Sequence, residues 1–271
     1  MLRRVLSGDG AVQLAAHDYG SPGGPDAPAC LLLHGNGLCA RAYEPLSARL
    51  RRAGFRVVAL DQRGAGASTL PAGGADLTWQ RFAEDALAVV DALQLRRCVG
   101  FGHSLGGAAL LLAEATRPGT FRAMFLFEPV VAPAGQPGVA HPWDERLKPK
   151  INGALNRRRV FPSRRAALEA YSSRPPLSFF APECLRLYVE HGFRDAAEGG
   201  VELCCEPATE SAIFALGPRA GAEERLPRVL CPVVVAMGGR DAHDGPAVVS
   251  PGVARGVARG RLERCAPRCT R

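Results

Sequence analysis

The sequence is poor in aromatic residues and lacks both a long apolar run and paired cysteines, and each absence excludes a class of protein. Aromatic residues make up 6% of the 271 residues and arginine is scattered, so nucleic-acid binding is not expected despite the net charge of +8. No apolar run approaches the roughly 20 residues that a membrane-spanning helix needs. The nine cysteines contain no C-x-x-C pair of the kind that binds metal or exchanges disulfides. We therefore expect no membrane span, metal or cofactor.

The beginning of the chain does not resemble a signal peptide. A Ser-Gly-Asp-Gly stretch at residues 7–10 interrupts any apolar core there. The surrounding residues predict a β-hairpin instead, with strands near residues 4–6 and 11–15. Cys30 and Cys98 lie in apolar runs, where cysteine behaves as a small buried hydrophobic residue. A cytoplasmic protein in a reducing compartment is therefore expected.

Beyond this hairpin, apolar runs of strand length alternate with helix-forming stretches. Hydrophobic residues make up 47% of the chain, which is enough to build one core. The predicted strands lie at residues 29–33, 55–60, 97–101, 123–127, 232–237 and 260–265. Such alternation is typical of an α/β fold with a mostly parallel, doubly wound sheet. We expect a single domain over residues 1–271.

The alternation is interrupted once, after the strand at residues 123–127, which is the sixth predicted strand when the two hairpin strands are counted. Residues from about 130 to 227 are rich in proline and arginine, with helical patterns near residues 163–171 and 182–192. An insertion of this size between two core strands indicates a helical cap that covers a pocket and keeps water out of it. Its arginine clusters at 157–159 and 164–165 are compatible with a solvated helix face or with capture of an acidic substrate.

The most informative motif is Gly-His-Ser-Leu-Gly at residues 102–106. It has the form G-x-S-x-G, and it stands between a predicted strand and the helix-forming run at residues 108–113. A nucleophilic serine on such a tight turn needs glycines on both sides, because a side chain there would clash with the turn. The motif therefore predicts that Ser104 is a nucleophile at the amino end of a helix, where free N–H groups favour negative charge.

Two other glycine-bearing turns follow predicted strands. His-Gly-Asn-Gly occupies residues 34–37, directly after the strand at 29–33. The second turn, at residues 61–68, contains Asp61 and Arg63. The side chains of Asp61 and Arg63 can fix that turn through charge-assisted hydrogen bonds, so we interpret it as structural.

These motifs, together with an acidic residue after a late strand, resemble those of the α/β-hydrolase fold family. The resemblance covers nearly the whole chain and is strongest to the cap-bearing esterase and lipase-like branch of that family. The resemblance implies an oxyanion hole built from the backbone N–H groups of Asn36 and Leu105. It also implies a catalytic acid after a late core strand. Asp241 is the first candidate by position, and Glu128 is the alternative.

The histidine that the family places after its last strand is missing from this sequence. No histidine follows His243, which lies two residues after Asp241 and is the first substitute candidate for the base. His141 and His191 lie in the predicted cap and are further candidates. His34 and His103 are expected to orient loops, and His17 to be structural. The sequence is accordingly expected to be a truncated or frame-shifted form of a working hydrolase.

Two hypotheses about function follow. The first is hydrolysis of a carboxylic ester or a related acyl bond of a small molecule through an acyl-Ser104 intermediate. The second, motivated by the missing histidine, is a non-catalytic protein of the same fold that binds a small apolar ligand or a partner under the cap. The acyl group and the oligomeric state are not readable from the sequence.

Overall fold

The computed structural model describes residues 1–24, 26–71, 77–132, 142–217, 220–238 and 249–265. Within them, an eight-stranded sheet has the order β1-β2-β4-β3-β5-β6-β10-β11. Its strands are β1 (Leu2–Leu6), β2 (Gln13–Asp18), β3 (Ala29–Leu33), β4 (Arg56–Asp61), β5 (Val99–His103), β6 (Ala123–Phe127), β10 (Val233–Gly238) and β11 (Gly260–Cys265). The pairs β1–β2 and β2–β4 are antiparallel, and every other neighbouring pair is parallel. The predicted hairpin and mostly parallel sheet are confirmed.

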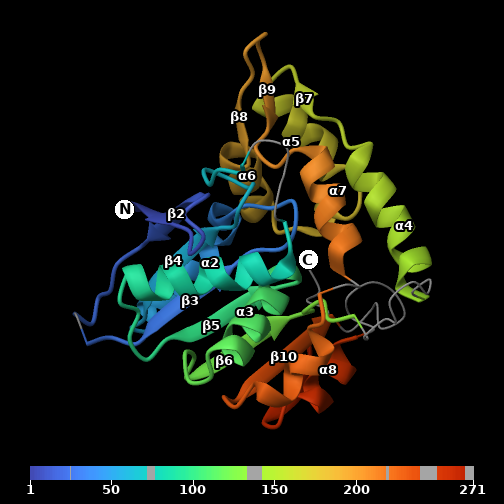
Figure 1. The fold of residues 1–271 in the computed structure, drawn as a ribbon. Coiled ribbons are helices and arrows are strands. Elements are labelled where there is room, and N and C mark those ends of the chain that lie inside the picture. Colours follow the sequence, from blue (N-terminus) through green and yellow to red (C-terminus); the bar gives the residue numbers. More distant parts are fainter. Residues whose placement is uncertain (25, 72–76, 133–141, 218–219, 239–248, 266–271) are drawn as a thin grey trace.

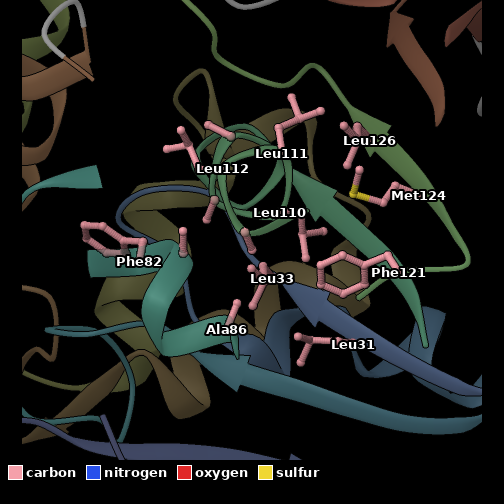
Figure 2. Close-up of a cluster of buried hydrophobic side chains, with 14 of the residues drawn as sticks. Leu31, Leu33, Phe82, Ala86, Leu110, Leu111, Leu112, Phe121, Met124 and Leu126 are labelled. Carbon is pink, nitrogen blue, oxygen red and sulfur yellow. The ribbon is translucent and has the colours of Figure 1, made fainter. Parts of the chain in front are cut away.

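Helices cover both faces of this sheet. Outside the insertion, the described residues form the helices η1 (Ala40–Tyr43), α1 (Glu44–Arg52), α2 (Trp79–Ala92), α3 (Leu105–Thr116) and α8 (Ser250–Gly256). Side chains of α2, α3 and α8 share the main core with alternate residues of the central strands, as Figure 2 shows for Leu110 of α3 and Leu31 of β3. On the other face, Leu46 of α1 packs against a smaller cluster that contains Leu32. Both faces of β3 are therefore covered, and its five residues are all buried.

The described elements from residue 142 to residue 216 form a separate layer beyond one end of the sheet (Figure 1). Its elements are α4 (Pro142–Leu155), β7 (Val160–Phe161), α5 (Arg164–Ser172), η3 (Leu177–Phe179), α6 (Pro182–His191), β8 (Phe193–Asp195), β9 (Val201–Leu203) and α7 (Pro207–Leu216). The chain then returns to the main core at η5 (Glu223–Arg228), whose Leu226 is buried there. The helices α5 and α6 coincide with the two helical patterns in the sequence. The antiparallel sheet β7-β9-β8 was not predicted, because strands of two or three residues are too short to show a period.

The described residues add two observations about composition. No helix among them is long and apolar enough to cross a membrane. The eight cysteines in the described part of the chain are all free thiols, and five of them are buried and raised in pKa by that burial: Cys30, Cys39, Cys98, Cys205 and Cys231.

The turn that follows β4 is fixed by buried charges. Asp61 accepts hydrogen bonds from the Ala40 N–H (2.8 Å) and the Ala67 N–H (3.1 Å), and its carboxylate also contacts His17 Nε2 at 2.8 Å. The guanidinium of Arg63 binds both carboxylate oxygens of Asp85 at 2.7 Å. Asp61 and Arg63 are almost fully buried, in agreement with the structural role predicted for them.

Replacing Arg63 with Met should destabilise the fold by about 3–5 kcal/mol, because the Asp85 carboxylate would lose its partner inside the protein. Equilibrium urea unfolding measures the change. Arg117→Met is the matched control, since Arg117 also pairs with an aspartate, Asp91, at 2.8 Å, but the two side chains are 43% and 61% exposed. This control substitution should lower the free energy of unfolding by less than about 1 kcal/mol. Equal losses in the two variants would contradict this account of the turn.

Candidate active site

Ser104 occupies a sharp turn between β5 and α3, in a backbone conformation that non-glycine residues rarely adopt. Its φ is 52° and its ψ is −114°. The turn is held by hydrogen bonds from the Ser104 N–H to the Phe127 carbonyl and from the Gly107 N–H to the Ser104 carbonyl, both 3.0 Å long. The strand, the turn and the helix thus have the arrangement that the sequence motif predicts.

The flanking glycines are required by close backbone contacts. A Cβ on Gly106 would lie 2.4 Å from the Leu33 carbonyl oxygen and 2.8 Å from that of His34. A Cβ on Gly102 would lie 2.6 Å from the Gly107 backbone. All three distances are too short for a Cβ atom, so neither position can carry a side chain. The amino end of α3 therefore packs directly against the end of β3, beside the turn at residues 34–37.

This packing brings two unused backbone donors to one pocket. Asn36, Ser104 and Leu105 line the same pocket. Among the described residues, neither the Asn36 N–H nor the Leu105 N–H donates a hydrogen bond. Two free donors beside a hydroxyl, one of them at a helix amino end, can stabilise negative charge that develops on a bound oxygen.

The rest of the pocket is apolar. The other side chains that line it come from α2, from the segment after β6, and from the inserted helices: Trp79, Val130, Ala132, Trp143, Leu147, Ile213 and Phe214. Trp79 is fixed by a hydrogen bond from its Nε1–H to the Ile213 carbonyl (3.1 Å), which joins the core to the insertion. No charged side chain is among the described lining residues, so the pocket suits an uncharged group.

Glu128, the alternative acid, lies directly after β6 with a positive φ of 46°. Its carboxylate oxygen Oε1 accepts a hydrogen bond from the Gly238 N–H at the end of β10 (3.0 Å). Glu128 thus connects the ends of two neighbouring strands on the side where β5 meets Ser104. Asp241, the first candidate, lies outside the described residues.

None of the four described histidines contacts the Ser104 hydroxyl. His34 Nδ1 lies 2.8 Å from the Gly35 carbonyl, and its Nε2 accepts from the Gln62 N–H at 3.0 Å. His103 Nδ1 lies 2.6 Å from the Tyr43 hydroxyl. These contacts fix loops, as predicted for both histidines.

Of the other four histidines, two lie in the described residues, namely His17 and His191. His17 contacts Asp61, in agreement with a structural role. His191 lies beside Arg41 (3.4 Å) and away from the pocket lining, and its burial and the Arg41 cation lower its pKa. The structure therefore does not support His191 as the base. His141 and His243 lie outside the described residues.

The arginine clusters do not form a binding site for an acidic substrate in the described pocket. Arg157 pairs with Glu210 at 2.6 Å, and Arg164 pairs with Asp195 at 2.9 Å. Arg159 contacts carboxylates of both Glu202 and Glu206 at 2.8 Å. The alternative of a solvated helix face is wrong for Arg157, whose side chain is only 15% exposed.

Comparison with known proteins identifies the family. The model of the alpha/beta hydrolase family matches residues 30–269, and the chain belongs to this family. A non-heme chloroperoxidase of Burkholderia pyrrocinia is 38% identical over 89 residues, which cover 33% of this chain and 31% of that protein. A bifunctional esterase/perhydrolase of Acinetobacter calcoaceticus is 36% identical over 100 residues, or 37% of this chain and 36% of that protein. This chain thus spans about a third of the length of these relatives.

A solved structure supports the fold over the full length. An E-2-(acetamidomethylene)succinate hydrolase superposes with a TM-score of 0.78 at 22% identity, covering 98% of this chain and 90% of that one. At this level of identity the similarity concerns the fold.

Sequence reasoning missed the side chains that surround Ser104 in space. Trp79 begins a helix after the second core turn, and Ile213 lies 134 residues later in the insertion. No local pattern distinguishes either one from ordinary core residues. A proline at the first turn of α7 was the only sequence signal for the helix that carries Ile213.

The stability of the protein should fall as the pH drops from about 6.5 to about 4, partly because of His103. Burial lowers the pKa of His103 to about 4, from 6.5 when unfolded. In this window the unfolded chain takes up a proton that the folded protein does not, which costs about 1.4 kcal/mol per pH unit.

In the variant His103→Gln, the glutamine side chain does not take up a proton in this pH range, but it keeps an acceptor for the Tyr43 hydroxyl. Unfolding free energies measured at several pH values should therefore decline less steeply for the variant over this window. Identical slopes in the two proteins would show that His103 is not held neutral by burial.

Proposed function

We propose that this protein hydrolyses a carboxylic ester or a related acyl bond of a small molecule through an acyl-Ser104 intermediate. One observation carries the proposal: Ser104 stands on a strained turn in a pocket that Asn36 and Leu105 also line, and the N–H groups of these two residues have no hydrogen-bond partner in the described part of the chain. A hydroxyl next to two free donors is the arrangement that acyl transfer requires.

The reaction begins with attack of the Ser104 oxygen on the substrate carbonyl carbon. A base takes the hydroxyl proton, and the carbonyl oxygen becomes an oxyanion that the Asn36 and Leu105 N–H groups bind. Collapse breaks the bond to the leaving alcohol, which receives the proton, and leaves an ester on Ser104. Water then attacks that ester by the same steps and releases the acid.

We assign the base to His243 and the acid that orients it to Asp241, with Glu128 as the alternative acid. The described histidines have other contacts, which favours a base outside them. Glu128 already binds the Gly238 N–H through its carboxylate, and this contact supports a structural role for it.

We further propose that the acyl group is apolar and uncharged. The described walls of the pocket are tryptophan, phenylalanine and aliphatic side chains, and a carboxylate placed among them would lack a partner. An unpaired buried charge costs several kcal/mol. The non-catalytic alternative predicts binding of the same kind of group without turnover.

Labelling with an alkyl fluorophosphonate tests this proposal, because the probe needs both an activated serine and an oxyanion site. Peptide mass spectrometry should find the adduct on Ser104, and Ser104→Ala should abolish it. Ser173→Ala, at an exposed serine, is the matched control and should label like the wild type. A probe that carries a terminal carboxylate should react at least about 100 times more slowly.

Absence of labelling in protein shown to be folded by circular dichroism would contradict catalysis by Ser104. In that case, binding of the neutral alkyl group without reaction would support the non-catalytic alternative. Equal rates with the charged and neutral probes would contradict the assignment of an apolar acyl group.

The acid is identified by comparing Asp241→Asn with Glu128→Gln. If Asp241 orients the base, its loss should lower kcat for an ester by about 10³–10⁴-fold. Glu128→Gln keeps an oxygen acceptor for the Gly238 N–H, so kcat should change by less than about tenfold. The opposite order would transfer the role to Glu128, and two small effects would contradict both assignments.

A further inference from the structure

The insertion contains a buried ion pair at its centre. Arg157, just after α4, places Nη1 2.6 Å from Oε2 of Glu210 in α7, and the two side chains are 15% and 11% exposed. The guanidinium also lies over the rings of Tyr171 (5.3 Å) and Tyr188 (5.7 Å) and hydrogen-bonds both hydroxyls. Burying such a pair costs desolvation energy, so stability alone is a weak explanation for it.

This cluster rests on the turn that carries Asn36. The Tyr188 hydroxyl donates to the Gly37 carbonyl at 2.9 Å, and Arg157 Nη1 approaches the same carbonyl at 3.5 Å. The Asn36 side chain in turn donates from Nδ2 to the Glu210 carbonyl at 2.9 Å. The Asn36 side chain and the Gly37 carbonyl are therefore both attached to the insertion.

Glu210 also lies so close to Gly37 that a side chain is excluded there. Gly37 has a φ of +72°, and a Cβ on it would lie 2.4 Å from the Glu210 carboxylate. The ion pair packs against the turn with no space between them. Because Arg157 and Glu210 neutralise each other, their effect on the turn is one of position more than of net charge.

We propose that Arg157, Glu210 and Tyr188 are positioning residues that hold the Asn36 backbone N–H at the oxyanion site. This inference rests on the proposed function of Ser104. Of the two donors, Leu105 is fixed by the core through α3, whereas Asn36 is fixed by the insertion. The oxyanion site is consequently complete only when the insertion is seated on the turn at residues 34–37.

The sharpest test is Tyr188→Phe, which removes the hydroxyl bound to Gly37 and keeps the ring in its cluster. A displaced oxyanion donor weakens the transition state more than substrate binding. We expect kcat for a neutral ester to fall by about tenfold or more, with KM changed by less than about twofold. Arg186→Met is the matched control, since Arg186 lies on the same helix α6 in an exposed pair with Glu190, and kcat should be unchanged.

A second readout does not depend on activity. The Leu38 N–H donates to the Gly35 carbonyl across the turn (3.2 Å), so hydrogen exchange of this amide reports how firmly the turn is held. Exchange at Leu38 should be at least about tenfold faster in Tyr188→Phe than in the wild type or Arg186→Met. Arg157→Lys keeps a cation for Glu210 but lacks the planar guanidinium group. Its kcat and its exchange rate at Leu38 should therefore fall between those of the wild type and those of Tyr188→Phe.

The outcomes separate this inference from the proposed function. Unchanged exchange and kcat in Tyr188→Phe, with an active wild type, would overturn the positioning role alone. A parallel loss of kcat, KM and melting temperature would also overturn it, because that pattern indicates general damage to the fold. A wild type without turnover would overturn the proposed function, and with it the catalytic purpose of the positioning.

Discussion

The site depends on one backbone constraint, the positive φ of Ser104 in a turn that has no room for side chains at Gly102 or Gly106. Such a conformation costs about 1–3 kcal/mol, so the surrounding structure has to impose it. The parallel strands β5 and β6 hold one side of the turn through the bond from Ser104 to Phe127. The helix α3, which is buried from Leu105 to Ala115, holds the other side. The fold thereby presents a hydroxyl and a free helix N–H in fixed relation to each other.

The remaining parts of the site come from the insertion. Its helices supply Trp143, Ile213 and Phe214 to the pocket, and its buried ion pair rests on the turn that bears Asn36. In the proposed mechanism, the core thus supplies the nucleophile and one donor, and the insertion supplies the apolar walls and fixes the second donor. Variation in the insertion would alter both the shape of the pocket and the geometry of the oxyanion site.

The features that sequence could predict are local ones. The strand at residues 29–33 has the predicted bounds, because a fully apolar run between turns leaves little ambiguity. The turn at Ser104 was predictable because the glycines that it requires, Gly102 and Gly106, lie two residues away on either side in the sequence. Arg157 was not, because in the sequence it is one of three arginines and its partner Glu210 lies 53 residues later. Pairings of this kind depend on how the insertion folds, and no periodicity records them.

The central claim is that Ser104 carries the acyl group, and trapping the intermediate tests it most directly. The protein would be mixed with a neutral butyryl ester, quenched in acid within the first turnover, digested and analysed by mass spectrometry. The account predicts a butyryl group on Ser104 that disappears as hydrolysis proceeds. Hydrolysis without acylated Ser104, at a rate that Ser104→Ala retains, would contradict it.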